Sequence, residues 1–219
     1  MIEEILGAGV AAAEAFEDLP GVVLFPEEDE VVAKAVDKRR REFATARACA
    51  RKALAALGQP SAPIVTGYRG APQWPPGVVG SITHCDGYRA AAVARAADVT
   101  TLGVDAEPDE PLPDGVLDLV AGPEEQAWLA GKGATTAGPC WDRLLFSAKE
   151  SVYKAWFPLT RRWLDFSDAT LTFDPMTSTF TARLLVPGPV VGDRQVAEFA
   201  GRWLARDGLV LTAIVLPVR

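Results

Sequence analysis

Two long segments with helical periodicity, each followed by several short strands, limit what this chain can fold into. In residues 28–57 the apolar side chains recur at helical spacing, and Gly58 and Pro60 end the pattern. Residues 140–156 repeat this periodicity, and Pro158 is expected to end the second helix. Strand-like segments follow each helix, at 78–83, 88–95 and 101–105 and then at 169–173, 179–186, 195–206 and 209–216. The sequence therefore predicts an α+β fold.

The repeated order of elements predicts two similar halves that meet near residue 105 and form one compact unit. Asp86-Gly87 and Asp207-Gly208 are the expected turns of two antiparallel hairpins. We expect an N-terminal half of residues 1–104 and a C-terminal half of residues 105–219. The remaining segments are expected to be loops at 60–76 and 131–138, a linker at 108–115, and short helices at 116–120 and 124–129.

The composition excludes several classes of protein. A net charge of −7 opposes general nucleic-acid binding, which needs a basic surface to neutralise phosphates. Acidic residues stand where a signal peptide would have basic ones, and no apolar run reaches the roughly 18 residues of a membrane helix. Three separated cysteines form no zinc or disulfide pattern. A cytoplasmic protein is expected.

Three acidic residues suggest a magnesium site. Asp105 and Glu107 alternate in the stretch T-L-G-V-D-A-E-P, so both point to one face of a predicted strand. Glu150 lies on the second long helix in F-S-A-K-E-S-V-Y-K-A-W, flanked by Lys149 and Lys154. Magnesium binds carboxylates together with phosphate oxygens, and a lysine ammonium suits a phosphate. The alternatives are a solvated strand end and a simple surface salt pair between Glu150 and Lys154.

Further candidates for anion binding lie in the N-terminal half. His84 is the only histidine, and it follows Ser81 and Thr83 at the end of the first predicted strand. An imidazole can donate a hydrogen bond to a phosphate oxygen. The first long helix carries eight of the chain's 22 lysines and arginines, among them Arg39 and Arg47, which could anchor a second phosphate. The competing interpretations are a histidine satisfied by the backbone and a solvated basic face.

The chain resembles the 4'-phosphopantetheinyl transferases, of the class that activates surfactin and enterobactin synthetases. The resemblance rests on three segments in order, G-S-I-T-H-C-D-G-Y, T-L-G-V-D-A-E-P and F-S-A-K-E-S-V-Y-K-A-W-F-P-L-T. It implies a pseudo-twofold arrangement of two halves, each a long helix packed on a small, mainly antiparallel sheet, with coenzyme A in the cleft between them. It also implies Mg²⁺-dependent or Mn²⁺-dependent transfer of the phosphopantetheine arm of coenzyme A to a carrier-protein serine, releasing 3',5'-ADP.

The resemblance also implies roles for individual residues. Asp105, Glu107 and Glu150 would bind the metal, and Glu150 and Lys154 would be catalytic. Either Glu150 or a metal-bound water would be the general base, and the sequence does not choose between them. The residues expected to bind coenzyme A are Arg39, Arg47, Arg69, Ser81, Thr83, His84, Asp105, Lys149 and Lys154.

Two positions depart from the family pattern. Relatives often have a lysine where this chain has Thr66, so Arg69 is expected to replace that contact with the coenzyme. The residue before the histidine is often asparagine or serine in relatives, whereas Thr83 stands here. A threonine hydroxyl can still donate one hydrogen bond.

The expected partners follow from the same resemblance. They are coenzyme A and the acyl and peptidyl carrier domains of fatty acid, polyketide and nonribosomal peptide synthesis, including siderophore assembly. An enzyme of the holo-acyl-carrier-protein synthase type is expected, as a monomer with no nucleic-acid or membrane partner. The alternatives are a magnesium-dependent phosphohydrolase or nucleotidyl transferase, and a non-catalytic relative that binds coenzyme A or a carrier.

Overall fold

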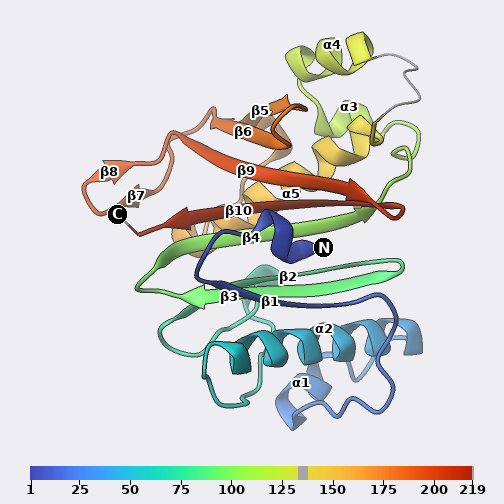
Figure 1. Ribbon diagram of the computed structural model, residues 1–219, viewed down its shortest axis with the longest axis vertical. Helices are drawn as coiled ribbons and strands as arrows, with labels where there is room; N and C mark the ends of the chain where they lie inside the picture. The colour runs from blue at the N-terminus through green and yellow to red at the C-terminus, as the bar shows by residue number, and fades with distance from the viewer. Residues whose placement is uncertain (133–137, 219) are drawn as a thin grey trace.

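The chain stacks a helix, a sheet, a second sheet and a second helix on one another in the computed structural model, which describes residues 1–132 and 138–218 (Figure 1). The two outer helices are α2 (Asp37–Ala56) and α5 (Trp141–Thr160). A three-stranded sheet lies against α2, and a five-stranded sheet lies against α5. This architecture confirms the α+β prediction.

The N-terminal part contains the three-stranded sheet, whose antiparallel strands follow the order β1-β3-β2. Its two long strands meet at Asp86 and Gly87, and the left-handed backbone of Gly87 confirms the predicted turn. The elements are η1 (Ile2–Ile5), β1 (Val10–Ala15), α1 (Pro26–Val31), α2, η2 (Tyr68–Gly70), β2 (Val78–Cys85) and β3 (Tyr88–Arg95).

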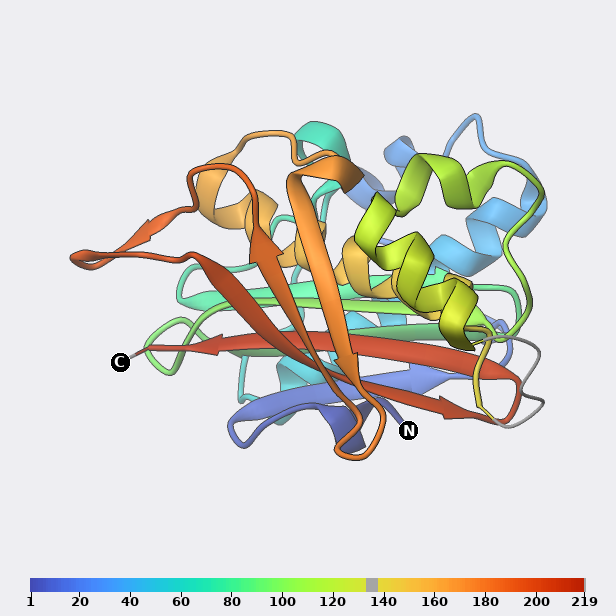
Figure 2. The same ribbon diagram turned by 90° about the horizontal axis from the view of Figure 1, so that it is seen from above.

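The C-terminal part contains the five-stranded antiparallel sheet in the order β4-β10-β9-β6-β5. Seen from above, α3 and α4 lie beside the β5 and β6 strands (Figure 2). The elements are β4 (Val99–Pro108), α3 (Val116–Val120), α4 (Pro123–Lys132), α5, η3 (Phe166–Asp168), β5 (Ala169–Asp174), β6 (Thr179–Leu184), β7 (Val190–Val191), β8 (Arg194–Gln195), β9 (Glu198–Arg206) and β10 (Leu209–Pro217).

Small side chains in β3 allow the layers to pack closely on both faces of the first sheet. Ala91 and Val93 pack against α2, whereas Ala90, Ala92 and Ala94 pack against the second sheet. The alternation of side chains along a strand produces this division. A strand covered on both faces is buried almost throughout, as β3 is.

Two hydroxyl groups join the two sheets where β2 lies beside β4. The Ser81 Oγ accepts a hydrogen bond of 3.1 Å from the Val104 backbone N–H. The Thr83 Oγ1 accepts one of 3.0 Å from the Ala106 backbone N–H. These side chains satisfy donors at the edge of β4 that would otherwise be buried without partners. The two sheets are therefore held in a fixed relation next to Asp105.

Gly103 lets β4 and α5 approach closely. A Cβ atom at this position would lie 2.1 Å from the Ser151 carbonyl oxygen and 2.7 Å from the Ala155 backbone nitrogen. The neighbouring Thr101 hydroxyl donates to the Ala155 carbonyl oxygen at 2.8 Å, which holds the same two elements together. The acidic residues that follow Gly103 on β4 are thereby placed against the middle of α5.

Gly103→Ala is expected to lower the free energy of unfolding by about 1 to 3 kcal/mol or more, because the added methyl group must push two backbone segments apart. Urea unfolding would measure the loss. Gly7→Ala is the matched control, because a Cβ at Gly7 meets no atom within 4 Å. Equal stability of both variants would contradict the close approach.

The predicted helix at 28–57 is wrong at its N-terminal end. The structure divides it into α1 and α2, with Val32–Val36 outside both helices. Glu28 is fully buried, where it accepts bonds from the Arg51 guanidinium and the Ile64 N–H, and this contact turns α1 away from the axis of α2. Val36 is 73% exposed, so the apolar periodicity that includes this residue does not mark a buried helix face.

Other boundaries also differ from the prediction. Helix α5 continues past Pro158 to Thr160, because a proline in the last turn removes only one backbone donor. The segment 195–206 is divided between β8 and β9. The strand β1 was not predicted, since its run V-A-A-A-E-A has little β-branched content. The loop predicted at 131–138 falls largely on residues 133–137, outside the described part of the chain.

The structure bears on the predicted symmetry of the two parts and on the predicted boundary between them. The sheets differ in strand number, and the pseudo-twofold axis stays a prediction. The expected boundary at 104/105 falls inside β4, a strand that pairs with β10 along its length. Within residues 1–132 and 138–218, no helix has the length and apolar character needed to cross a bilayer.

Candidate functional site

Asp105 lies at the centre of the candidate site, where β4 passes α5. Its Oδ1 accepts a hydrogen bond of 2.7 Å from the Lys154 ammonium and one of 3.2 Å from the Thr83 hydroxyl. The Asp105 side chain is 6% exposed, and its Oδ2 has no hydrogen-bond partner among the described residues. A buried carboxylate oxygen without a partner is costly, so this atom is available to a bound cation or donor.

Glu107 points to the same face of β4 as Asp105, as the alternation predicted. Its Oε2 accepts a hydrogen bond of 3.1 Å from the Arg143 guanidinium on the first turn of α5. The pKa of Glu107 is raised to about 7, because burial and the negative charge of Asp105 raise it more than Arg143 lowers it. The negative charge of Asp105 thus disfavours the ionised form of Glu107.

Glu150 faces the site from the middle of α5. It makes no hydrogen bond or ion pair within residues 1–132 and 138–218. Burial raises the pKa of its carboxyl group, the charge of Asp105 raises it further, and Lys154 lowers it. The structure therefore brings Asp105, Glu107, Glu150 and Lys154 into one region, as the sequence predicted.

His84 and Arg39 meet at the outer end of this region. The Arg39 guanidinium lies 2.6 Å from the His84 Nε2, and because arginine only donates, that nitrogen accepts the hydrogen bond. Burial, together with the charges of Arg39 and Lys154, lowers the pKa of His84 to about 4. The imidazole is consequently neutral near pH 7 and lies in a positive environment suited to an anion.

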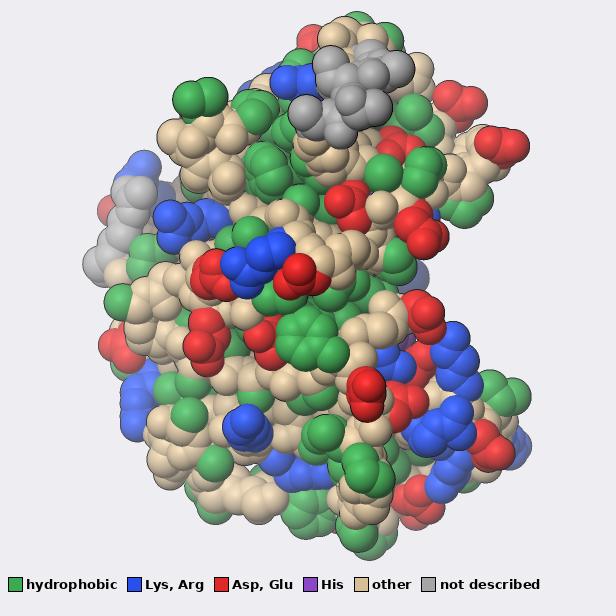
Figure 3. Space-filling view, turned by 45° about the vertical axis from the view of Figure 1, so that its right-hand side comes forward, with side chains coloured by type: hydrophobic (Ala, Val, Ile, Leu, Met, Phe, Trp, Pro, Cys, Tyr) green, Lys and Arg blue, Asp and Glu red, His purple; other side chains and the backbone are tan. Residues whose placement is uncertain are grey.

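A notch in the molecular surface separates the two halves on one side (Figure 3). Lysine and arginine side chains gather on its lower rim, and aspartate and glutamate side chains lie above them. The first turns of α2, in the lower half, carry the consecutive basic residues 38–41. Lys38 and Arg40 are already paired with Asp86 and Asp29. Arg39 is 45% exposed and is the basic residue that reaches His84.

A cleft of about 630 Å³ opens on the other side of Lys154, and we call it the main cleft. The segment 67–74 and the first residues of β2 form one wall, and the second half of α5 forms the other. Glu150, Tyr153 and Lys154 line it, and so does Ser81, although Ser81 is only 3% exposed. The Tyr153 hydroxyl is buried without a hydrogen-bond partner among the described residues.

Arg69 stands at the rim of the main cleft, as expected for a residue that contacts a ligand there. Its backbone has φ = 55°, in the left-handed region that non-glycine residues seldom adopt. Its guanidinium carbon lies 5.0 Å from the centre of the Trp163 ring. The Thr66 hydroxyl already accepts a hydrogen bond from the Arg47 guanidinium, so this oxygen is engaged within the protein.

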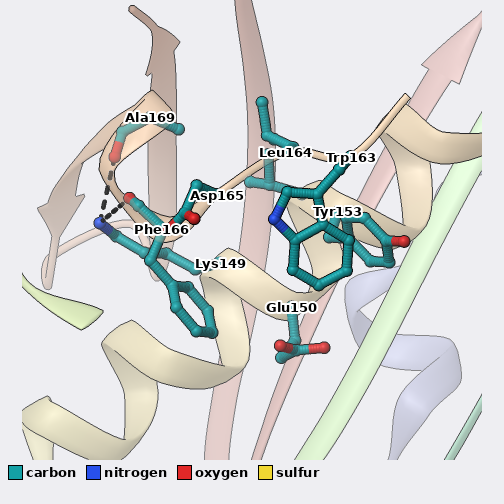
Figure 4. Close-up of a pocket in the computed structure, with 9 residues that line it drawn as sticks. Lys149, Glu150, Tyr153, Trp163, Leu164, Asp165, Phe166 and Ala169 are labelled. Atoms are coloured by element: carbon teal, nitrogen blue, oxygen red, sulfur yellow. Dashed lines mark hydrogen bonds between the residues drawn. The ribbon is translucent and has the colours of Figure 1, made fainter. Parts of the chain in front are cut away.

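A smaller pocket of about 120 Å³ adjoins the outer side of α5, and we call it the Trp163 pocket (Figure 4). Trp163 and Tyr153 lie beside each other at one end, with ring centres 5.0 Å apart. Glu150 and Tyr153 line both this pocket and the main cleft. The two cavities therefore meet along one turn of the helix.

The structure places the Lys149 ammonium away from Asp105 and Lys154. Its ammonium donates to four oxygen atoms at 2.8 to 3.1 Å, which are the Glu125 Oε2 and the carbonyl oxygens of Val120, Phe166 and Ala169. Lys149 and Glu125 are 4% and 3% exposed. Its ammonium lies on the far side of α5 from Asp105, although Lys149 also lines the Trp163 pocket, and its contact with the coenzyme stays a prediction.

Arg47 is likewise buried and already engaged. Its Nε donates to the Ile64 carbonyl oxygen at 2.7 Å, and its guanidinium lies 4.0 Å from the centre of the Phe43 ring. It lines neither the main cleft nor the Trp163 pocket. Its contacts fix the segment that leads to Arg69, so any role toward a phosphate would require these bonds to change.

The predicted metal ligands are close but not in a coordination arrangement. Within the described residues, no three His, Cys, Asp or Glu side chains form a group that could already hold a metal ion. Instead, Lys154 forms an ion pair with Asp105, and Arg143 forms one with Glu107. The ligand set stays a prediction.

Sequence reasoning missed two residues of the site, Arg143 and Tyr153. Arg143 lies seven positions before Glu150, and therefore on the same face of α5, so the helical periodicity contained this signal. Tyr153 was not selected because an aromatic residue on a helix is usually part of the core. Only the partnerless hydroxyl in the folded chain distinguishes it.

Comparison with known proteins gives consistent matches over the whole chain. Residues 27–94 match the family model of the 4'-phosphopantetheinyl transferase N-terminal domain, and residues 101–201 match that of the 4'-phosphopantetheinyl transferase superfamily. The chain is 59% identical to 4'-phosphopantetheinyl transferase Svp of Streptomyces mobaraensis, over 99% of this chain and 89% of that protein. It is 52% identical to 4'-phosphopantetheinyl transferase Npt of Nocardia iowensis, over 98% and 99% of the two chains. It is 49% identical to 4'-phosphopantetheinyl transferase PptT of Mycobacterium tuberculosis, over 94% and 92%.

Proposed function

The chain belongs to the 4'-phosphopantetheinyl transferase superfamily, and on this premise we propose that it moves the phosphopantetheine arm of coenzyme A onto a serine of a carrier protein. In this reaction the serine oxygen attacks the phosphorus joined to pantetheine, the bond from that phosphorus to the bridging oxygen breaks, and 3',5'-ADP leaves. The serine proton must be accepted by a base. Holo-acyl-carrier-protein synthase activity is the finer form of the proposal.

The convergence of Asp105, Glu107, Glu150 and Lys154 beside the main cleft supports this proposal most directly. These residues come from two elements far apart in sequence, β4 and α5, and Glu150 and Lys154 also line the main cleft. A diphosphate with a nucleotide on one side and a long flexible arm on the other needs such a site. Isolated acidic residues on the surface would have no such relation to a cleft.

The cavities suggest how coenzyme A binds. The Lys154 ammonium is 26% exposed and can turn from Asp105 toward a diphosphate oxygen. The nucleotide would extend toward His84 and Arg39, where positive charge gathers in an acidic protein. The pantetheine arm would enter the main cleft, where the buried Tyr153 hydroxyl can bond one of its amide groups. Ser81 and Thr83 would act mainly by holding β4 in position beside β2, through their hydrogen bonds to the β4 backbone.

The donor set fits the magnesium or manganese ion that the family resemblance implies. Asp105, Glu107 and Glu150 would hold it, because Asp105 has a buried carboxylate oxygen without a partner and its charge raises the pKa of both glutamates. A bound cation would give the Asp105 oxygen a partner and would favour the ionised form of the two glutamates. When bound, it would supply positive charge to stabilise the diphosphate oxygens as 3',5'-ADP leaves.

We assign the general base to Glu150. Its carboxylate has no hydrogen bond or ion pair in the described part of the chain and is exposed to both cavities, so an incoming serine hydroxyl can reach it. Burial and the Asp105 charge raise its pKa and make it a stronger proton acceptor, whereas a bound cation would lower that pKa and act in the opposite direction. Lys154, one helical turn away, stabilises the charge that develops on the phosphoryl oxygens.

Incubation with coenzyme A and a purified apo carrier domain tests the proposal. The carrier is expected to gain the mass of one phosphopantetheine group, and 3',5'-ADP should appear in equal amount. A carrier with its target serine changed to alanine should remain unmodified. Release of 3',5'-ADP at the same rate without any carrier would instead identify a phosphohydrolase, and the proposal would be wrong.

The sequence supports further proposals about the setting of the reaction. Acyl and peptidyl carriers of polyketide, nonribosomal peptide and siderophore synthesis are the proposed partners, as the family resemblance implies, and one relative, 30% identical over 81% of this chain, is named enterobactin synthase component D of Salmonella typhimurium. A cytoplasmic, monomeric enzyme that uses no nucleic acid or membrane stays a prediction from composition.

A further inference from the structure

A network of ion pairs lies behind the contact between Arg39 and His84. The first turn of α2 lies beside the turn between β2 and β3, where the Lys38 ammonium is 3.1 Å from the Asp86 carboxylate (Figure 1). Arg39, the next residue along the helix, reaches His84 with 2.6 Å between its guanidinium and the His84 Nε2. A long side chain that is 45% exposed loses much rotamer freedom when it is ordered, so further contacts are needed to hold Arg39 in this position.

Arg89 anchors this network on β3. It stands directly opposite His84 in the ladder between β2 and β3, and its side chain is 5% exposed. Its Nη1 donates a hydrogen bond of 2.9 Å to the Cys85 carbonyl oxygen, at the end of β2. Its Nη2 lies 2.9 Å from the Asp18 Oδ1 and 3.5 Å from the Glu42 Oε1. These contacts fix the buried guanidinium beside the hairpin turn.

Glu42 connects this buried arginine with the exposed one. Its side chain is 12% exposed, and its Oε1 is the oxygen that faces Arg89. Its Oε2 lies 3.9 Å from the Nη1 of Arg39, which is three residues earlier on the same face of α2. Within residues 1–132 and 138–218, Glu42 is the acidic residue that forms an ion pair with Arg39. The four residues His84, Arg39, Glu42 and Arg89 therefore join α2 to the hairpin in one closed set of contacts.

The network leaves one positive charge without a balancing carboxylate. Its cations are Arg39, Arg41 and Arg89, and its anions are Asp18 and Glu42, since Asp18 also lies 3.5 Å from the Arg41 guanidinium. The excess charge is at Arg39, which is farther from the shared Glu42 carboxylate than Arg89 is. An arginine held in a fixed position with one positive charge to spare is suited to bind a phosphate group.

We propose that Glu42 is a positioning residue, which holds Arg39 against His84 and thereby lets the enzyme recognise the 3'-phosphate of coenzyme A. Glu42 acts through Arg39 and not by contact with the coenzyme. Because Arg39 is already ordered, the phosphate binds without the entropy loss of fixing a long side chain. The carboxylate of Glu42 does not repel the phosphate strongly, because Arg89 balances its charge. This inference rests on the proposed transferase function and specifies how that enzyme selects its coenzyme.

Glu42→Gln tests this role by calorimetry with two ligands, coenzyme A and 3'-dephospho-coenzyme A, with Mg²⁺ present. The variant is expected to bind coenzyme A about threefold to tenfold more weakly than wild type, which is the range for ordering one long side chain. Its affinity for 3'-dephospho-coenzyme A should equal that of wild type. Tighter binding of coenzyme A would show that the carboxylate only repels the phosphate, and equal weakening for both ligands would show a general structural loss. Either result would overturn the proposal.

Two further variants separate an effect through Arg39 from an effect through Arg89. In an Arg39→Gln background, Glu42→Gln should have no additional effect on the affinity for coenzyme A, because the residue that Glu42 positions is absent. An additional loss in that background would contradict the proposal. Glu42→Asp keeps the buried charge near Arg89 but shortens its reach toward Arg39, so a stably folded Glu42→Asp protein should also discriminate less between the two ligands. Full discrimination by this variant would likewise contradict the proposal.

Asp29→Asn is the matched control. It neutralises the carboxylate that pairs with Arg40, the residue after Arg39 on α2, and it should leave the affinities for both ligands unchanged. A wild-type protein that binds both ligands equally would overturn the recognition proposed for Arg39 and Glu42, even if it transfers phosphopantetheine. A wild-type protein that distinguishes the two ligands but modifies no carrier would instead overturn the transferase function.

Discussion

Glu150→Gln is expected to slow phosphopantetheine transfer by about 10²-fold to 10³-fold while the protein stays folded, which is the range for losing one general base or one electrostatic stabiliser. Glutamine keeps the shape of the side chain but cannot accept the serine proton. Because Glu150 has no hydrogen bond or ion pair in the described part of the chain, its removal should break no stabilising contact. Initial rates with an apo carrier domain and thermal unfolding would measure the two effects separately.

The pH dependence gives the same prediction an independent readout. Burial and Asp105 raise the pKa of Glu150, and a base is active only when deprotonated. The wild-type rate should therefore fall as the pH drops through the pKa that Glu150 has in the metal-loaded enzyme, and Glu150→Gln should lose this acidic limb. Glu124→Gln, at an exposed position on α4, is the control and should keep both rate and pH profile. A near wild-type rate in Glu150→Gln would remove Glu150 from the mechanism.

Local signals in the sequence were sufficient for the hairpins and the second long helix. Asp86-Gly87 and Asp207-Gly208 provide the left-handed backbone that tight hairpin turns need, and both turns occur. The first long helix was misjudged because its apolar periodicity extends through Val32–Val36, where the contact of Glu28 with Arg51 breaks the axis. That contact joins residues 23 positions apart, so no short window of sequence contains it.

The candidate site was predictable to the extent that it depends on periodicity. Strand alternation placed Asp105 and Glu107 on one face, and helix periodicity placed Glu150 and Lys154 on another. Their convergence depends on Gly103, which permits β4 and α5 to touch, and this requirement is visible only in the folded chain. The Trp163 pocket was less predictable, since it is built from segments that meet through tertiary packing alone.

Lys149 shows where periodicity is not enough. It lies near the boundary between the polar and apolar faces of α5. Because it precedes Glu150 in the sequence, Lys149 was predicted to bind a phosphate of the coenzyme. The structure turns it to the opposite side, where its acceptors come from α3, α4, η3 and β5. A lysine buried among four oxygen atoms links these elements to α5 and thereby shapes the Trp163 pocket, whose wall it also forms.

Lys149→Met is expected to lower the free energy of unfolding by about 3 to 5 kcal/mol, because it leaves the buried Glu125 carboxylate without its counter-charge. The Glu125 oxygens would still accept bonds from the backbone N–H groups of Gly122 and Leu171, but no cation would offset their charge. Affinity of the folded fraction for coenzyme A should be unchanged. Urea unfolding and calorimetry at low temperature would measure these two quantities.

The double variant Lys149→Met with Glu125→Gln separates a structural role from a role in binding. Neutralising both partners removes the buried charge, so part of the stability lost in Lys149→Met should return. A coenzyme ligand would behave differently: its loss would weaken coenzyme binding in both variants, and the second substitution would not restore stability. Weak coenzyme binding by a Lys149→Met protein as stable as wild type would return Lys149 to the phosphate site, and the contacts with Phe166 and Ala169 would then describe only one of two positions of the side chain.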